Sequence, residues 1–181
     1  PARSRVQGRA GVLFVGRLSA EKGVATLATA AVLQEGRQSI AVVGTGPEQA
    51  RLEGVVGIRL LGWQAPAFVY ARMRRSACLV MPSVWYENFP RTLVEAFACG
   101  LPVIASRLGA MADLIRDGET GLLFSPGDAV DLARALAWAA SHAGEMRRMG
   151  EAARREYEEK YTPQVNFARL MSIYGEAQRA P

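Results

Sequence analysis

Two carboxylates and two cations stand where they could bind a charged ligand that carries hydroxyl groups. Glu87 and Glu95 are eight residues apart, and Glu95 falls in an apolar segment, 93–98, that is predicted to be helical. A carboxylate in such a segment needs polar partners, and either sugar hydroxyls or a local arginine could supply them. Arg17 and Lys22 flank the start of another predicted helix. Free N–H groups and the helix dipole favour an anion there, although both could be ordinary surface cations.

Short apolar runs alternate along the chain with segments of helical periodicity. The runs predicted to be strands are 11–15, 39–43, 58–61, 77–81, 101–105 and 121–124. The predicted helices cover 23–35, a short segment from about 47, 66–75, 90–99, a short segment near 110–116, 128–141, 144–159 and 163–178. Strands that are apolar on both faces and separated by helices indicate a parallel sheet covered on both sides. We therefore expect an α/β fold: a doubly wound, six-stranded, Rossmann-like parallel sheet with an all-helical C-terminal tail.

In this architecture ligands bind at the carboxyl ends of the strands, so the loops after the strands are the place to look for chemistry. Gly44-Thr45-Gly46 follows the second strand and lacks the third glycine of a dinucleotide fingerprint, which argues against an NAD site. We expect a tight turn there, with Thr45 or Gly46 starting the next helix. Pro90 suits the first turn of the helix that carries Glu95, because that N–H would be unpaired in any case.

Length and charge limit the classes of protein to consider. The chain has 181 residues, enough for one domain, with a formal net charge of +5 and a pI of about 9.7. Such a charge suits a polyanion: nucleic acid, an anionic membrane surface or a phosphorylated small molecule. Two clusters hold many of the arginines: Arg72, Arg74 and Arg75, and then Arg147, Arg148, Arg154 and Arg155. Glutamates are mixed into the second cluster, which predicts a solvated helix face: Glu145, Glu151, Glu156, Glu158 and Glu159.

The remaining signals exclude several sites. No apolar run approaches the length of a membrane span, and the start of the chain does not resemble a signal peptide. Cys78 and Cys99 stand in apolar contexts, so we expect two buried thiols in a reducing cytoplasm and no metal or disulfide framework. We assign no role to His142.

The segment from Glu87 to Ser106 resembles the Glu-x7-Glu signature of retaining GT-B glycosyltransferases of the "group 1" family. Phe14–Gly23 resembles that family's donor-phosphate loop. Other short motifs follow in the family's order and spacing: Val43–Pro47, Leu61-Gly62, Pro82-Ser83 and Asp117–Leu123. The resemblance covers about residues 10–160. Pro90 departs from the pattern because the family often has glycine there, and Gly109-Ala110 and Asp113 stand where the family commonly has Gly-Gly and Glu.

The resemblance implies roles for particular residues. Arg17 and Lys22, in the loop that starts at Gly16, would neutralise the diphosphate of a nucleotide-sugar. Glu95 would accept hydrogen bonds from the ribose, and Glu87 from the donor sugar, so the catalytic set would be Glu87, Arg17 and Lys22. Backbone N–H groups would cradle sugar and phosphate at four residues: Asn88, Phe89, Arg91 and Thr92. Three residues would lie near the nucleobase: Gly62, Trp63 and Gln64.

The resemblance also implies a division of labour. Residues 1–160 would be the donor-binding domain, and 161–181 a helix that crosses to a missing N-terminal acceptor domain or packs on its own domain. The enzyme would transfer a hexose from a UDP-, GDP- or ADP-sugar with retention, without cofactor or metal, and the isolated domain would be inactive. We expect a cytoplasmic location, with peripheral contact to an anionic membrane surface as a further expectation.

The sequence leaves three alternatives to a transferase open. One is a nucleotide-binding regulatory module without transferase activity. Another is a phosphorylase or epimerase of the same fold; a pyridoxal-phosphate lysine is unsupported because only Lys22 and Lys160 exist. A nucleic-acid binder is suggested by charge alone, and no aromatic residues are interleaved with the arginines as a single-strand binder would require.

Overall fold

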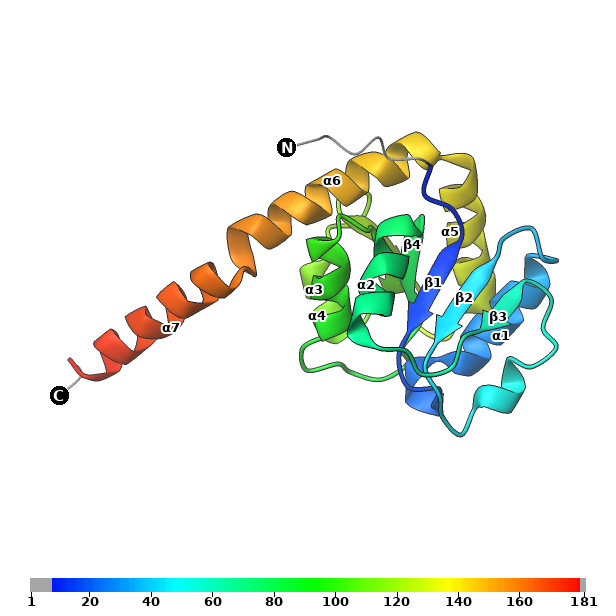
Figure 1. Cartoon of the computed structure of the whole chain (residues 1–181), viewed down its shortest axis with the longest axis horizontal. Helices are drawn as coiled ribbons and strands as arrows, with labels where there is room; N and C mark the ends of the chain where they lie inside the picture. The colour runs from blue at the N-terminus through cyan, green and yellow to red at the C-terminus, as the bar shows by residue number, and fades with distance from the viewer. Residues whose placement is uncertain (1–7, 180–181) are drawn as a thin grey trace.

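The computed structural model of the chain describes residues 8–179, in which six short strands form one parallel sheet (Figure 1). The strands are β1 (Val12–Val15), β2 (Ile40–Val43), β3 (Ile58–Leu60), β4 (Cys78–Met81), β5 (Val103–Ser106) and β6 (Gly121–Phe124). Their order is β3-β2-β1-β4-β5-β6, which confirms the predicted doubly wound α/β fold. Since the order reverses between β1 and β4, the loops that follow these two strands flank the topological switch point, where such sheets bind ligands.

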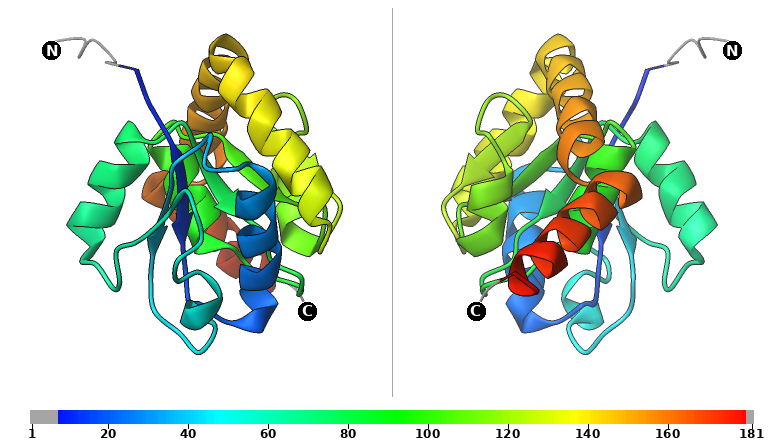
Figure 2. Two further views of the ribbon diagram at one scale, coloured as in Figure 1. Left: turned by 90° about the vertical axis from the view of Figure 1, so that its right-hand side faces the viewer. Right: turned by 90° about the vertical axis from the view of Figure 1, so that its left-hand side faces the viewer.

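Helices cover both faces of the sheet (Figure 2), which is why every residue of β2, β4 and β5 is buried. One face is covered by α1 (Val24–Leu33) and α5 (Ala129–Ser141), and the other by α2 (Pro66–Arg75), α3 (Arg91–Ala98) and α4 (Gly109–Leu114). The long helix α6 (Ala143–Lys160) contributes Met149 to the first core and Ala153 to the second, so it joins the two layers.

Two predicted elements begin later than expected. The strand expected from Leu101 starts only at Val103, because the Leu101 N–H donates to Ala96 O at 2.9 Å and Pro102 has no N–H. Gly100, in the left-handed conformation at φ 61°, makes this return at the end of α3 possible. The helix expected from about 47 is a single 3-10 turn, η2 (Gln49–Arg51), so neither Thr45 nor Gly46 starts it.

The second arginine cluster is only partly a solvated helix face. Glu156, predicted to lie on that face, is 5% exposed. Its carboxylate accepts from Arg116 Nη1 at 2.5 Å and from Lys160 Nζ at 2.6 Å. The prediction was wrong for this residue, because a cation from outside α6 and one from its last turn satisfy a carboxylate that would otherwise be costly to bury.

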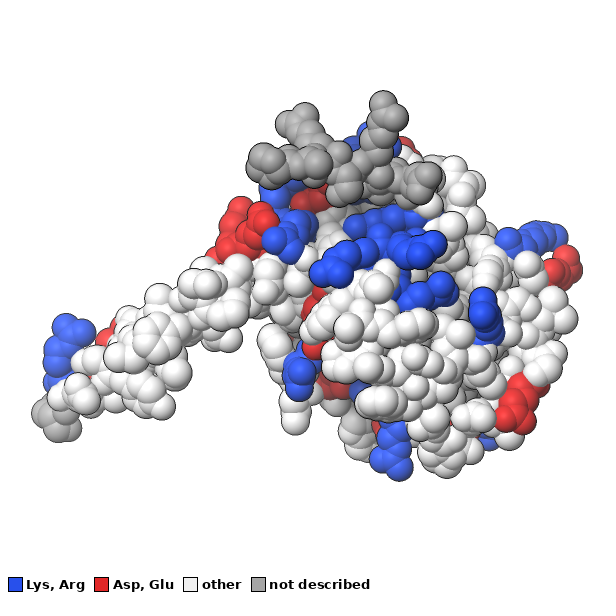
Figure 3. Space-filling view, in the orientation of Figure 1, with Lys and Arg blue, Asp and Glu red and all other residues white. Residues whose placement is uncertain are grey.

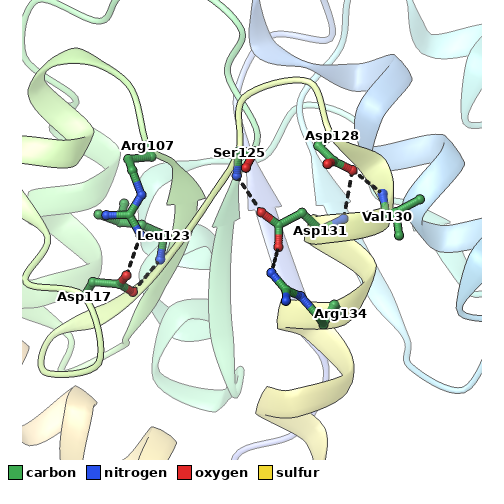
Figure 4. A network of polar contacts seen from close by, with 8 residues as sticks. All are labelled: Arg107, Asp117, Leu123, Ser125, Asp128, Val130, Asp131 and Arg134. Carbon is green, nitrogen blue, oxygen red and sulfur yellow. Dashed lines mark hydrogen bonds and ion pairs between the residues drawn. The ribbon is translucent and has the colours of Figure 1, made fainter.

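Asp117 joins β6 to the loop after β5 (Figure 4). Its carboxylate accepts from Arg107 Nη2 at 2.5 Å and from the Leu123 N–H at 2.9 Å. The sequence resemblance grouped Asp117 with the family's motifs, and its contacts in the structure are those of a residue that holds this loop in place.

The connection from β6 to α5 is also held by carboxylates (Figure 4). Asp128 caps α5 by accepting from the Val130 and Asp131 N–H groups, both at 2.9 Å. The Ser125 N–H, which donates to Asp131 at 2.8 Å, lowers the pKa of Asp131, and the hydrogen bond from Arg134 lowers it further.

The two cysteines differ in burial. Cys78 is fully buried, and burial raises the pKa of its thiol to about 12. Cys99 is half-buried rather than buried as predicted, because it caps the carboxyl end of α3. Both thiols are free. Among the described residues, no helix combines the length and the apolar character needed to cross a bilayer.

The last helix, α7 (Pro163–Ala177), projects from the body of the molecule (Figure 1). Thr162 caps it, but none of its residues is buried. It exposes a row of apolar side chains: Phe167, Leu170, Met171, Ile173 and Tyr174. In this structure α7 therefore does not pack against the core of its own domain.

Candidate functional site

The loop after β1 and the loop after β4 are packed directly against each other at the switch point. The first contains the 3-10 turn η1 (Ala20–Lys22), and the Val84 N–H of the second donates to Glu21 O at 3.0 Å. Gly23 makes the approach possible: it is left-handed at φ 70°, and a Cβ there would lie 1.8 Å from Pro82 O. No larger residue fits this junction without moving one loop away from the other.

The loop after β2 supports the first loop from the other side. The Leu18 N–H donates to Thr45 O at 3.0 Å, and a Cβ on Gly44 would lie 1.9 Å from Gly16 O. Gly44 and its neighbours therefore act through close backbone approach, as a spacer that fixes the shape of loop 16–23.

Lys22 and Glu87, predicted from the sequence as partners of one ligand, form an ion pair. Lys22 Nζ lies 2.5 Å from Glu87 Oε1, and the two side chains are 30% and 19% exposed. The Ser83 hydroxyl donates to the same oxygen at 2.8 Å. The pair is thus half-buried and in reach of a ligand.

Arg17 adds a second cation to this edge. Its side chain is exposed and has no carboxylate partner among residues 8–179. The Ser19 hydroxyl, which donates to Glu21 at 2.6 Å, lowers the pKa of Glu21, and the charges of Arg17 and Lys22 lower it further. The loop thus carries two cations, and Arg17 is the one that no carboxylate of the described residues pairs with.

Glu95 lies on the second turn of α3, as predicted. Arg91 Nη2 is 3.5 Å from Glu95 Oε1, but the Arg91 side chain is 84% exposed, so this contact is weak. Burial raises the pKa of the Tyr70 phenol, and the negative charge of Glu95 raises it further. The Glu95 side chain is 28% exposed, which leaves it open to hydroxyl groups of a ligand.

The beginning of α3 offers backbone donors. Pro90 is the N-cap and its side chain caps nothing. The N–H groups of Asn88, Phe89 and Thr92 make no hydrogen bond within residues 8–179, whereas the Arg91 N–H donates to Phe89 O at 2.9 Å. Three of the four amides predicted to face a ligand are therefore available.

The loop after β3 lies beside the same edge. Gly62 accepts from the Gly44 N–H at 2.8 Å, which ties this loop to the one after β2. Gln64 Nε2 donates back to Leu61 O at 2.7 Å. Trp63 is 74% exposed, so its ring is free to stack on a planar ligand.

The geometry joins cations, free N–H groups and two carboxylates around one edge of the sheet. Cations and N–H donors suit an anion, and the carboxylates suit hydroxyl groups. The described part of the chain holds no group of three or more His, Cys, Asp or Glu side chains that could bind a metal ion. The sequence analysis gave Ser83 no role, although its position two residues after an apolar strand was a usable signal.

Comparison with known proteins shows the family to which the chain belongs. The model of the family "Glycosyl transferases group 1" matches residues 3–156. A glycogen synthase of Mycobacterium tuberculosis is 30% identical over 189 residues, which cover 98% of this chain and 45% of that protein. A GDP-mannose-dependent alpha-mannosyltransferase of Mycolicibacterium smegmatis is 35% identical, over 82% of this chain and 38% of the relative. The chain spans about half the length, or less, of these curated relatives.

Solved structures show the same fold. Sucrose-phosphate synthase from Thermosynechococcus elongatus superposes with a TM-score of 0.83 at 26% identity, over 95% of this chain and 46% of that one. Anabaena HepE, solved in complex with UDP and glucose, superposes with a TM-score of 0.81 at 23% identity, over 94% of this chain and 49% of that one. By its family match and its fold, this chain belongs to the group 1 glycosyltransferases.

Proposed function

We propose that the chain is the C-terminal, donor-binding half of a retaining glycosyltransferase that moves a hexose from a nucleoside diphosphate to a glycan or lipid acceptor. The observation that supports this most is the Lys22–Glu87 ion pair at the switch point, beside N–H groups at the start of α3 that have no partner in the described part of the chain. One cation next to one hydroxyl-binding carboxylate is what the junction between a diphosphate and a sugar requires.

Each part of the donor has a place in this proposal. The diphosphate lies against Arg17, Lys22 and the amides of Asn88, Phe89 and Thr92. The ribose hydroxyls donate to Glu95, and the hydroxyls of the hexose donate to Glu87. The nucleobase lies over the loop of Gly62, Trp63 and Gln64. UDP, GDP and ADP are all candidates, and the HepE complex makes UDP the first to test.

The proposed chemistry uses the same groups. Cleavage of the anomeric C–O bond places negative charge on the leaving diphosphate, and preorganised cations and N–H dipoles stabilise charge that develops in a transition state. Arg17 and Lys22 would then do what a divalent metal does in other transferases. Retention would follow from attack on the same face that the diphosphate leaves, with Glu87 binding the sugar rather than attacking it.

The acceptor and the remaining half of the enzyme lie outside this chain in the proposal. The apolar side chains that α7 exposes would dock on the acceptor-binding domain. The isolated chain should therefore bind nucleotides and catalyse no transfer, because acceptor and donor meet only between two domains.

A titration of the chain with UDP, GDP, ADP and their sugars, beside Glu95→Ala, tests the proposal. We expect one nucleotide to bind at micromolar to millimolar concentrations, with Glu95→Ala weakening it by about 1–3 kcal/mol, as for loss of a hydrogen bond to a charged group. Failure of every nucleotide to bind would refute the proposal. Binding without any transfer, even when the acceptor-binding half is supplied, would favour the regulatory module instead.

The basic surface supports one further partner, an anionic membrane surface. A groove of about 1150 Å³ at the amino ends of β1 and β4 is lined by five arginines and one glutamate: Arg9, Arg37, Arg74, Arg147, Arg154 and Glu151. Basic side chains gather on the face that Figure 3 shows. Arg9 and Arg154 also donate to carbonyl groups at the end of α3, so part of this charge is structural. Salt-sensitive sedimentation with phosphatidylglycerol vesicles, and none with phosphatidylcholine vesicles, is the expected result.

A further inference from the structure

The Glu87 carboxylate is held through only one of its two oxygens. Oε1 lies 2.5 Å from Lys22 Nζ and accepts from Ser83 Oγ at 2.8 Å. Oε2 has no hydrogen-bond partner among residues 8–179. One oxygen is therefore anchored to the protein, while the other is left for a ligand.

The two partners of Oε1 differ in what else they can bind. An ammonium group has three donors, so Lys22 can hold Glu87 and a phosphate at once. A hydroxyl group has a single proton, and that of Ser83 is committed to Glu87. Ser83 is only 2% exposed, so it does not reach a ligand itself.

Ser83 lies in a more buried part of the loop than Glu87 does. It is the second residue after β4, buried beside Pro82, whose carbonyl contacts Gly23. Glu87 lies farther along the same loop, among exposed residues such as Tyr86 and Asn88. The hydrogen bond thus ties a side chain of the loop to the rigid end of a central strand.

We propose that Ser83 is a positioning residue for the sugar end of the donor: it fixes Oε1 of Glu87 so that Oε2 accepts from a hexose hydroxyl. This inference rests on the proposed function and adds to it a division of labour. Lys22 acts on both the diphosphate and the sugar, whereas Ser83 acts on the sugar alone.

The test compares Ser83→Ala with wild type in binding a nucleoside diphosphate and the matching sugar nucleotide: UDP with UDP-glucose, GDP with GDP-mannose, and ADP with ADP-glucose. Ser106→Ala is the matched control, because Ser106 is a fully buried serine at the end of the neighbouring strand β5 and its hydroxyl has no partner in the described chain. Ser83→Cys keeps the size of the side chain with a weaker donor.

We expect Ser83→Ala to bind the diphosphate within about twofold of wild type and the sugar nucleotide about tenfold more weakly, as for one lost hydrogen bond to a charged group. The affinity of Ser83→Cys for the sugar nucleotide should lie between those of Ser83→Ala and wild type. Ser106→Ala should bind both ligands as wild type does. If Ser83→Ala and Ser83→Cys weaken binding of both ligands equally and lower the melting temperature, Ser83 is merely structural. If neither variant weakens binding of either ligand, the assignment is also overturned. If wild type binds no nucleotide, the proposed function itself fails, and Ser83 has no sugar to position.

Discussion

Lys22 and Glu87 stand 65 positions apart in the sequence, yet their side chains form a contact of 2.5 Å across the switch point. Each comes from a loop that follows a central strand, and the loops meet because Gly23 lets the backbone of one approach that of the other. The pair therefore depends on the sheet order as much as on the two residues.

Replacing Lys22 should weaken binding of nucleoside diphosphates more than replacing an exposed arginine outside the candidate site. Lys22→Ala removes a half-buried cation and leaves the Glu87 carboxylate near the phosphates. We expect a loss of about 2–3 kcal/mol in titration calorimetry. Arg37→Ala is the control: Arg37 pairs with Glu35 at the exposed surface, and its loss should change affinity by less than about 0.5 kcal/mol. Equal losses would mean that net charge, not the ion pair, governs binding.

Glu95 should recognise the ribose hydroxyls specifically. Wild type should bind UDP, or whichever nucleotide it prefers, more tightly than the 2′,3′-dideoxy analogue by about 1–3 kcal/mol. Glu95→Ala should bind the two with nearly equal affinity, because the acceptor of these hydrogen bonds is gone. A variant that still distinguishes the two nucleotides would show that another group binds the ribose.

The contact between Gly23 and Pro82 can be separated from the strain of a left-handed residue. Gly23→Ala should destabilise the chain by about 3 kcal/mol or more in urea unfolding, because a Cβ there would overlap Pro82 O. Gly54→Ala is the matched control: Gly54 has nearly the same φ, 73°, but nothing lies within 4 Å of a Cβ there. Gly54→Ala should lower the free energy of unfolding by only about 1–2 kcal/mol. Similar costs for both variants would mean that the loops can move apart freely.

Asp131 should contribute stability that depends on pH. Its pKa is lowered in the folded chain by the Ser125 N–H and then by Arg134, so its contribution is present above the ordinary carboxyl pKa and is lost as pH falls through the lower folded value. Asp131→Asn should therefore be less stable than wild type at pH 7, and the difference should shrink in acid below about pH 4. Thermal unfolding from pH 2.5 to 7 measures the difference in stability between wild type and Asp131→Asn. A difference that does not change with pH would contradict the lowered pKa of Asp131 as its cause.

Removal of residues 162–181 should leave the domain folded. None of the residues in α7 is buried, so little of the core is lost with it. We expect the melting temperature to fall by less than about 3 °C, which corresponds to about 1 kcal/mol for a chain of this size. A larger fall would show that α7 packs on this domain in solution.

Several features of the protein could be predicted from the sequence because local patterns carry them. Buried strands separated by helices gave the parallel sheet, and the sheet placed the loops of Lys22 and Glu87 at one edge. The position of Glu95 on the second turn of α3 followed from Pro90 and the apolar residues after it. The strands, the sheet and the position of Glu95 all follow from residue periodicity, which is a property of short, continuous segments of the sequence.

Other features were decided by tertiary structure. The burial of Glu156 depends on Arg116, 40 residues away, and no pattern within α6 reveals that cation. The role of Gly44 depends on the backbone of Gly16 in another loop. The role of the Ser83 hydroxyl depends on the orientation of Glu87, because it donates to the same oxygen, Oε1, as Lys22 does. Local residue patterns thus set the sheet, its layers and the residue types at its carboxyl edge. Contacts between distant loops decided which of these residues meet, because close backbone approach and charge pairing depend on distances that only the folded chain sets.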